Sequence, residues 1–329
     1  MVAMLSADDD DVRAAIPMPA AVAAVREALS DFGAGVFELP PRVQLGDGSF
    51  LVMSAFSSRA GSTVVKLLSV GVGRTPVIVG AATWTSAGSA DVVATDAAAV
   101  TALRTGAIVG VATDVLAVPG ASRLLVYGAG GQAADQVRAV HSVRPLSELT
   151  LVAPSAERAV PLAAALGSEL PGVRVSVCRP GGEDLRRVEI ICCATSATSP
   201  LFECADLPAD VHVNAVGSYR PQMCELPDEL VDTASVVAVD DRDACLAESG
   251  EVIRARRRGM DVSRLTPLHE LLDAPVARTG RTVFKSVGLA VQDWAVMDLL
   301  ARSLGVTESG RVEQAGSVGP SVPHPSGRR

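Results

Sequence analysis

The chain has 329 residues, 48% of them hydrophobic and 20% charged, which is enough apolar material for two domains with substantial cores. A net charge of -8 and an aromatic content of 3% argue against a nucleic-acid partner. The sequence has no uninterrupted run of about 18 apolar residues and no basic-then-apolar leader, so we expect no membrane partner and a cytoplasmic protein.

The six cysteines and four histidines show no metal-binding spacing. No two cysteines form a C-x-x-C pair, and Cys192 and Cys193 lie in an apolar run typical of a buried strand. We therefore expect no metal site and no Cys/His nucleophile.

The first third of the chain reads as a helix, several short strands and a second helix. Residues 12–33 have the spacing of an amphipathic helix that ends at a glycine. Short apolar runs separated by turn residues follow at 50–53, 63–70, 77–79 and 92–93. They predict a sheet of directly connected strands rather than β-α-β units. Residues 95–116 are again helical in spacing, and Pro119-Gly120 marks a boundary.

A glycine pattern of the dinucleotide-binding type follows this boundary. The apolar run 124–127 leads into Gly128, Gly130 and Ala133, which form the G-x-G-x-x-A variant. Gly128 permits the tight turn, Gly130 lets the backbone approach a pyrophosphate, and Ala133 lets the next helix pack closely. A second strand at 149–152 completes a β-α-β unit. The expected cofactor-binding residues of the turn are Gly128, Gly130, Gly131, Gln132 and Ala133.

The tip of the second strand bears on the choice between NADP and NAD. An acidic residue there would bind the ribose 2′-hydroxyl and repel a 2′-phosphate, but residues 153–158 read Ala-Pro-Ser-Ala-Glu-Arg. Ser155 can donate to a phosphate and Arg158 can pair with it, although a solvated arginine in a first helical turn would look the same. We predict NADP as the cofactor, with NAD as the alternative.

Four more apolar runs bring the strand candidates of this region to six. They cover residues 173–177, 188–193, 212–216 and 236–239. Such a series predicts a doubly wound parallel sheet, whose ligands collect beyond the carboxyl ends of the strands. Thr195 and Ser196 follow one strand, and Gly217 and Ser218 follow the next, so we expect all four to bind the cofactor.

Four stretches together resemble the ornithine cyclodeaminase/μ-crystallin family. They are Pro41-Arg42 with Lys66, the run 101–107 (TALRTGA), the turn 126–133 (VYGAGGQA) and the run 284–290 (FKSVGLA) with Asp293. The resemblance implies a dinucleotide domain inserted into a discontinuous α+β domain that forms a homodimer. This agrees with our reading of 284–305 as an amphipathic helix that returns to the first domain.

The predicted fold class is therefore α/β, with a Rossmann-type doubly wound parallel sheet inserted into a discontinuous α+β domain. Residues 1–118 plus 284–306 are expected to form the substrate-binding and dimerisation domain, and 119–283 the dinucleotide-binding domain. Residues 307–329 are rich in Gly, Ser and Pro, and a disordered tail is expected there.

The resemblance also implies a cluster of cationic side chains that holds the carboxylate of an amino or imino acid beside the nicotinamide. The matching substrate-binding residues are Arg42, Lys66 and Arg104. A guanidinium clamps a carboxylate bidentately, and an ammonium adds a point charge that can also transfer a proton. In the plain structural reading, Arg104 is a surface residue of a helix and Arg42 a loop residue.

One departure from the family pattern bears on the reaction. Cyclodeaminases carry an aspartate in a G-x-D-x-P-G-K-x-E-L segment, whereas residues 217–226 read GSYRPQMCEL, with Tyr219 at the aspartate position. A phenol with an ordinary pKa of about 10 is a poor base at neutral pH. Family members without this aspartate include amino-acid dehydrogenases and ketimine or cyclic-imine reductases, which this segment resembles better.

We therefore expect an NAD(P)-dependent oxidoreductase that acts on the C=N or CH–NH bond of a small α-imino or α-amino acid. Lys66 is the preferred proton donor and Tyr219 the other candidate. Two alternatives stay open: a cyclodeaminase-type ammonia lyase that uses bound NAD catalytically, and a non-catalytic μ-crystallin-like protein that binds NADPH and a ligand. The expected partners are the small substrate and a second copy of the chain.

Overall fold

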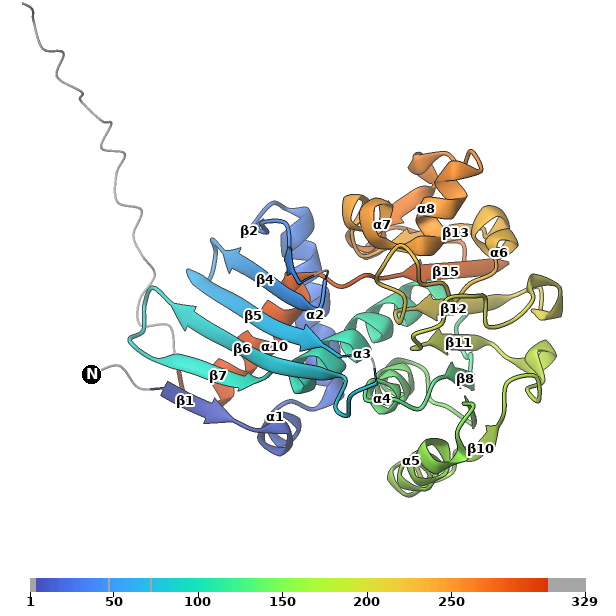
Figure 1. Ribbon diagram of the computed structural model, residues 1–329, viewed down its shortest axis with the longest axis horizontal. Coiled ribbons are helices and arrows are strands. Elements are labelled where there is room, and N and C mark those ends of the chain that lie inside the picture. The colour runs from blue at the N-terminus through green and yellow to red at the C-terminus, as the bar shows by residue number, and fades with distance from the viewer. Residues whose placement is uncertain (1–3, 47, 72, 307–329) are drawn as a thin grey trace, which may run out of the picture.

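The computed structural model describes residues 4–46, 48–71 and 73–306, in which two β-sheets lie side by side with helices between and around them (Figure 1). The first sheet has seven strands in the order β1-β7-β6-β5-β4-β2, with β3 also paired to β4. Its strands are β1 (Met4–Ala7), β2 (Phe37–Glu38), β3 (Val43–Leu45), β4 (Phe50–Ser57), β5 (Ser62–Val70), β6 (Ile78–Ser86) and β7 (Val92–Asp96).

Strands β4 to β7 form an antiparallel meander, as the closely spaced apolar runs predicted. Side chains alternate between the two faces along each strand, so one face of the sheet is buried and the other is not. The buried face packs against α10 and α3, and α2 packs in turn on both of these helices. The helices of this part are α1 (Asp9–Ala15), α2 (Met18–Gly33), α3 (Ala97–Leu116) and α10 (Ala290–Ser303).

Helix α3 runs between the two sheets and joins them (Figure 1). It is long and apolar enough to cross a membrane, but 94% of its apolar window is buried inside the protein, as in a core helix. Two glycines allow this close packing. A Cβ at Gly106 would lie 2.5 Å from the Asp135 carbonyl oxygen of α4, and one at Gly110 would lie 2.7 Å from Val22 of α2.

The second sheet has eight strands, all paired in parallel, in the order β10-β9-β8-β11-β12-β15-β13-β14. They are β8 (Arg123–Tyr127), β9 (Glu148–Val152), β10 (Arg174–Cys178), β11 (Ile190–Cys193), β12 (Val211–Ala215), β13 (Val236–Val239), β14 (Leu265–Pro267) and β15 (Arg281–Lys285). The helices are α4 (Ala133–Val143), α5 (Ala156–Glu169), α6 (Asp228–Thr233), α7 (Arg242–Glu248), α8 (Gly250–Arg257) and α9 (Leu268–Leu271).

Both faces of this sheet are covered, which explains why its strands read as continuous apolar runs. Helices α4 and α5 contribute Val137, Val140 and Leu166 to one core. Helices α6 and α8 contribute Leu230 and Val252 to a second core on the opposite face. The predicted α/β fold, a doubly wound parallel sheet beside a mixed sheet, is confirmed.

The structure differs from the predicted elements in several places, and the short strands β1, β2 and β3 were not predicted. The helix expected over 12–33 is two helices, because Pro17 cannot continue a helical hydrogen-bond ladder and instead caps α2. Strand β14 was not predicted. Strand β15 was also missed: it is a single short run, and it extends to Lys285, inside the segment 284–305 that was expected to be a helix returning to the first domain.

The division into 1–118 plus 284–306 and 119–283 stays a prediction, with β15 running across its second boundary. The expected disordered tail, 307–329, lies outside the described residues.

Candidate functional site

Lys66 is the only charged residue of β5, and it points into the protein. Strand alternation puts it on the same face as Val64 and Leu68, and its side chain is 0% exposed. Its Nζ lies 2.6 Å from Oδ1 of Asp293 on α10 and 3.2 Å from the Thr101 hydroxyl on α3. Three elements far apart in the sequence therefore meet at this ammonium.

The environment makes Lys66 a weaker base than an ordinary lysine. Burial lowers the pKa of Lys66 to about 8; Asp293 raises this pKa, and the nearby Arg104 and Arg42 lower it. A lysine with such a pKa exchanges its proton near neutral pH, which an exposed lysine does not.

Arg104 lies one helical turn after Thr101, on the same face of α3. Its Nη1 donates to Gln292 Oε1 at 2.7 Å, and its Nε lies 3.3 Å from Asp293 Oδ1. Asp293 stands in the first turn of α10, where the helix dipole favours a carboxylate. Asp293 thus holds both cations, and its pairing with Lys66 and Arg104 is what allows all three charges to be buried.

Gly288 brings the two guanidinium groups of the site together. Its φ is +89°, and a Cβ built on it would lie 2.7 Å from Arg104 Nη1, so a larger residue would strain the backbone and displace the Arg104 guanidinium. Its carbonyl oxygen accepts a hydrogen bond from Arg42 Nη2 at 2.8 Å.

Arg42 reaches from the loop before β3 to the second sheet. Its Nη2 also donates to the Val287 carbonyl oxygen at 3.1 Å and lies 3.0 Å from Glu248 Oε2, at the end of α7. Burial raises the pKa of Glu248, and Arg42 lowers it. Among the described residues, these contacts all involve Nη2, so the N–H groups of Arg42 Nη1 and Nε can donate to a ligand.

Several buried polar atoms of this cluster have no hydrogen-bond partner among the described residues. They include Gln292 Nε2, Asp293 Oδ2 and Arg104 Nε. Buried polar groups are nearly always paired, so an unpaired donor and acceptor beside three cations fit a site completed by an anionic ligand with a polar group of its own. Arg42, Lys66 and Arg104, predicted from separate stretches, do meet here.

The glycine turn after β8 is open where a dinucleotide phosphate would approach. Gly128 has a φ of +109°, and a Cβ there would lie 2.7 Å from the Ala194 carbonyl oxygen. A Cβ at Gly130 or Gly131 would meet nothing within 4 Å. Gln132 begins α4 without a side-chain cap, and its Oε1 is buried with no described partner, while Ala133 is buried. This fits a pyrophosphate at the helix N-terminus.

The residues expected at the ribose end lie at the start of α5. Ser155 begins this helix without a capping hydrogen bond, and Arg158 is exposed in the first turn. Neither has a side-chain hydrogen bond or ion pair to another described residue.

The loops after β11 and β12 lie at the same edge of the sheet, as predicted. Ser196 is exposed, and Thr195 and Gly217 are partly exposed. Ser218 is 0% exposed, and its hydroxyl donates to Glu251 Oε1 at 2.7 Å. Its side chain therefore supports the loop from beneath.

Tyr219 lies apart from the cationic cluster in its described contacts. Its ring packs partly against the core between the second sheet and α6 to α8, and the Arg220 guanidinium lies 5.4 Å from the ring centroid. Among the described residues, no group of three or more His, Cys, Asp or Glu side chains could hold a metal ion.

Sequence reasoning missed Glu248, Gln292 and Gly288, and it quoted Asp293 without a role. Gly288 and Asp293 lie in the run that carries the family resemblance, so they could have been singled out there. Glu248 gave no local signal, because its partner Arg42 is distant in the sequence.

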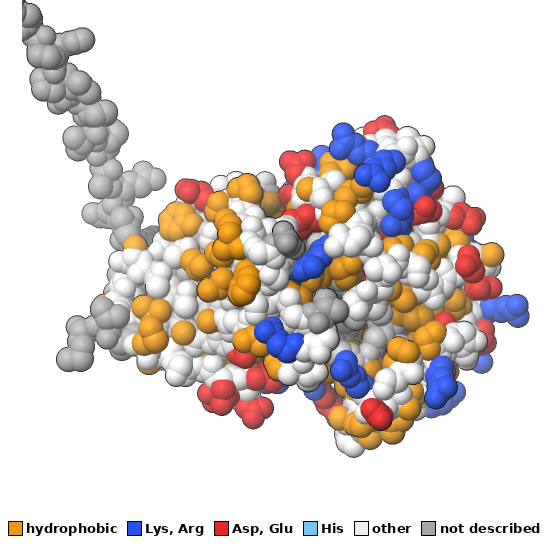
Figure 2. Space-filling view, in the orientation of Figure 1, with side chains coloured by type: hydrophobic (Ala, Val, Ile, Leu, Met, Phe, Trp, Pro, Cys, Tyr) orange, Lys and Arg blue, Asp and Glu red, His pale blue; other side chains and the backbone are white. Residues whose placement is uncertain are grey.

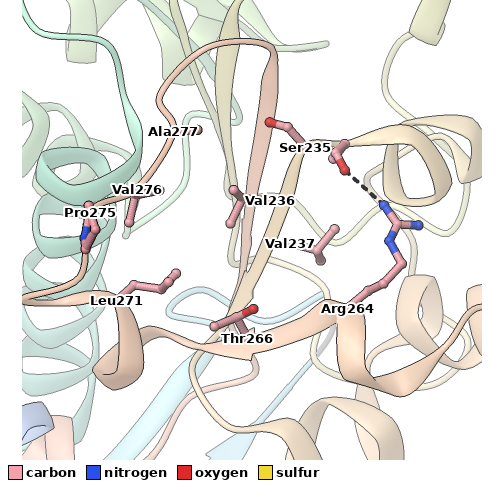
Figure 3. A pocket seen from close by; sticks show the side chains of 10 residues that line it. Ser235, Val236, Val237, Arg264, Thr266, Leu271, Pro275, Val276 and Ala277 are labelled. Atoms are coloured by element: carbon pink, nitrogen blue, oxygen red, sulfur yellow. Dashed lines mark hydrogen bonds between the residues drawn. The ribbon is translucent and has the colours of Figure 1, made fainter.

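A separate cleft of about 310 Å³ lies where β13 begins, beside the segment after α9 (Figure 3). Arg264 at its edge donates to the Ala234 carbonyl oxygen at 2.9 Å, and Val236, Val276 and Leu271 line it. This is the amino end of β13, opposite to the strand ends that carry the glycine turn and the loops after β11 and β12.

Comparisons with known proteins agree with this arrangement. The model of the ornithine cyclodeaminase/mu-crystallin family matches residues 2–304. The chain is 36% identical over 208 residues to the Δ1-pyrroline-2-carboxylate reductase of Bacillus cereus (61% of this chain, 63% of that protein). It is 33% identical over 207 residues to the ketimine reductase mu-crystallin of Mus musculus (62% of this chain, 63% of that protein). The matched regions thus cover less than two thirds of these relatives.

A solved structure has the same fold. It is Thermococcus litoralis Δ1-pyrroline-2-carboxylate reductase in complex with NADH and L-proline, which superposes with a TM-score of 0.85 and 24% identity over 92% of this chain and 98% of that chain.

Proposed function

The chain belongs to the ornithine cyclodeaminase/mu-crystallin family, and from this premise we propose that it is an NAD(P)-dependent oxidoreductase that reduces the C=N bond of a small α-imino acid or oxidises the matching amino acid. The single observation that carries the proposal is the buried cluster of Arg42, Lys66 and Arg104 around Asp293, with unpaired polar atoms beside it. The named activities of the relatives point the same way.

The arginines bind the substrate carboxylate in this proposal. Arg42 offers Nη1 and Nε and Arg104 offers Nη2, since Arg42 Nη2 and Arg104 Nη1 donate to protein oxygens and Arg104 Nε faces Asp293. Each of these N–H groups can donate one charge-assisted hydrogen bond to the carboxylate, and donors from two arginines fix the orientation of the α-carbon as well as its place.

Lys66 moves the proton. Its pKa of about 8 lets it give a proton to the imine nitrogen during reduction and take it back in the reverse direction. Asp293 keeps the ammonium oriented at 2.6 Å. Tyr219 is the weaker candidate, because its ring packs against a core away from this cluster.

The glycine turn from Gly128 to Ala133 holds the dinucleotide pyrophosphate in this proposal, and Ser155 and Arg158 accommodate the 2′-phosphate of NADP, with NAD as the alternative. When bound, the cofactor supplies the hydride that is added to the α-carbon of the substrate. The loops at Thr195–Ser196 and Gly217–Ser218 support its nicotinamide end.

The test is turnover of imines by purified protein. We expect oxidation of NADPH, and more slowly of NADH, with Δ1-pyrroline-2-carboxylate or Δ1-piperideine-2-carboxylate, and about 1,000-fold slower turnover with a Lys66→Met variant that still binds NADPH. Cofactor binding without turnover on a panel of imino acids, and of oxo acids with amines, would contradict the proposal. Ammonia release from ornithine or lysine without a net change in the cofactor would instead indicate a cyclodeaminase.

The outer face of the first sheet supports a homodimer as the working form. Figure 2 shows hydrophobic side chains gathered over this sheet. The outward-facing residues of β4, β5 and β6 include no charged side chain, and Leu67 among them is 51% exposed. The large exposed apolar residues there are Val43, Leu45, Phe50, Phe56, Val65, Leu67 and Val79. An uncharged apolar face of this kind is typical of a subunit interface.

Sedimentation analysis tests the dimer. We expect the native chain to sediment as a dimer and Leu67→Lys to sediment as a monomer, because a buried unpaired ammonium opposes association. Val160→Lys, at an equally exposed valine on α5, is the control and should stay dimeric. A monomeric native chain would contradict this part of the proposal.

The six cysteines are all free, which supports the cytoplasm, a reducing compartment, as the place where the protein acts.

A further inference from the structure

Glu225 lies beneath the two loops that follow β11 and β12. Its side chain is 0% exposed, and its two oxygens accept four hydrogen bonds. Oε1 accepts from the Thr195 backbone N–H at 2.7 Å and from the Thr195 hydroxyl at 2.8 Å. Oε2 accepts from the N–H groups of Gly217 at 2.9 Å and Ser218 at 3.1 Å. Each oxygen thus serves one loop.

The two loops touch directly above this carboxylate. A Cβ at Gly217 would lie 2.2 Å from the Thr195 carbonyl oxygen and 2.5 Å from Glu225 Oε1, so nothing larger than glycine fits between them. The backbone next to Glu225 also pairs with the first loop, since Cys224 N–H donates to the Ala197 carbonyl oxygen at 2.8 Å. Glu225 is therefore bonded to both loops at the point where they meet.

A second layer holds Glu225 in place. Glu251 Oε1 accepts from the Glu225 backbone N–H and from the Ser218 hydroxyl, both at 2.7 Å. Lys285 Nζ donates to the Ser218 hydroxyl at 2.6 Å and also to the Ser218 carbonyl oxygen. The position of Glu225 is thus held by a network in which each partner is itself hydrogen-bonded.

This network is connected through the chain to the cluster of Arg42, Lys66 and Arg104. Lys285 directly precedes the segment 286–288. In this segment, Gly288 lies beside the Arg104 guanidinium and accepts a hydrogen bond from Arg42. Asp240 Oδ2 holds that segment by accepting from the N–H groups of Val287 at 3.1 Å and Gly288 at 2.7 Å. Residues 285–288 therefore connect two parts of the site. One part is the pair of loops held by Glu225, and the other is the set of residues that would bind the substrate.

We propose that Glu225 is a positioning residue that sets the place of the nicotinamide end of the cofactor relative to the bound imino acid, by holding the loops after β11 and β12 together. This inference rests on the proposed function. The turn after β8 would hold the adenosine diphosphate half, and Glu225 does not touch this turn in the described structure.

Glu225→Gln is the primary test. The amide keeps the size of the side chain, but in either orientation its NH₂ group faces the N–H donors of one loop, so that loop loses its tie. We expect the Kd for NADPH to rise about tenfold and kcat for imine reduction to fall about 100-fold. We expect the Kd for ADP and the KM for the imino acid to stay within about threefold.

Glu189→Gln is the matched control. Glu189 Oε2 accepts from the N–H groups of Ser122 at 2.9 Å and Arg123 at 3.0 Å, the same kind of tie at the amino end of β8. This variant should lower the melting temperature yet leave the NADPH-to-ADP affinity ratio unchanged. A merely structural role for Glu225 would give the same unchanged ratio, and that result would overturn the proposal.

Thr195→Val is the second variant, for the case that Glu225→Gln does not fold. It removes one of the four hydrogen bonds to Glu225 and keeps the backbone donor. We expect an NADPH Kd about threefold higher with unchanged ADP binding; equal weakening of both ligands, or of neither, would overturn the proposal. If the native chain binds NADPH but reduces no imine, the proposed function fails while the affinity ratio still decides the role of Glu225. A native chain that binds no dinucleotide would overturn both.

Discussion

The chain has two lysines, and each stands in its own buried cluster of charge. Lys66 belongs to the cationic cluster, with Arg42, Arg104, Gln292 and Asp293. Lys285 belongs to the loop cluster, with Ser218, Glu225 and Glu251. The other 27 of the 29 Lys and Arg residues are arginines, so lysine occurs only where its ammonium is buried.

The two clusters differ in how completely their polar atoms are paired. In the described structure, no buried side-chain atom of the loop cluster lacks a hydrogen-bond partner, whereas Gln292 Nε2 and Asp293 Oδ2 in the cationic cluster do. A fully paired network stabilises one arrangement of the chain, while an incompletely paired one keeps bonding capacity for a ligand. A buried lysine with carboxylates around it can therefore hold the chain in place when all its partners are paired, and can leave groups free for a ligand when they are not.

Replacing the lysines gives the largest expected effects and the sharpest test of this difference. Lys66→Met should reduce imine turnover about 1,000-fold, because it removes the proton donor. NADPH affinity should stay within about twofold of the native value, since the glycine turn is untouched. Steady-state kinetics and a fluorescence titration of NADPH measure the two quantities.

Lys285→Met is the counterpart in the loop cluster. It should lower the free energy of unfolding by about 3–5 kcal/mol, because Glu251 is left as a buried carboxylate without its cation. Urea unfolding measures this change. If the two variants lost stability and turnover in equal proportion, the distinction between the clusters would not stand.

Gly288→Ala should act mainly on the cationic cluster. The added Cβ meets Arg104 Nη1 and the backbone is held at a φ of +89°, so we expect the KM for the imino acid to rise about 30-fold. Gly305→Ala is the matched control, since Gly305 has a φ of +78° and a Cβ there meets nothing within 4 Å. Gly305→Ala should strain the backbone in the same way but leave the KM for the imino acid unchanged.

The pH dependence of reduction should report the charge of Lys66. Because the protonated amine is the donor, the rate should fall as pH rises through the Lys66 pKa of about 8. Asp293→Asn removes a group that raises this pKa, so the decline should begin at lower pH and the rate at neutral pH should fall about tenfold. If the pH–rate profile of Asp293→Asn matched that of the native protein, Asp293 would have no part in the proton transfer.

The smallest effect is expected outside both clusters, at the exposed Arg158. Arg158→Ala should raise the Kd for NADPH about fivefold and leave that for NADH unchanged, because only NADPH carries the 2′-phosphate. Arg257→Ala, at an exposed arginine on α8, should change neither value. Equal weakening of both cofactors would argue against Arg158 as the reader of the phosphate.

The sequence by itself determined the parts of this protein that depend on neighbouring residues. The G-x-G-x-x-A turn, the strands around it and the meander of the first sheet could be predicted, because periodicity and turn chemistry act over a few residues. Lys66 inside an apolar strand was also visible as an unusual local choice, whereas Arg104 was singled out only by the family resemblance.

Tertiary structure alone decided which of these side chains meet and which are satisfied. Asp293 between Lys66 and Arg104, Glu248 on Arg42, and Glu225 under two loops are contacts between distant segments, and no local pattern encodes a partner. Strand β15 was hidden for the same reason, since its five residues become a strand only between β12 and β13. Which buried charges pair depends on how distant segments pack together, so only the folded chain determines these pairs.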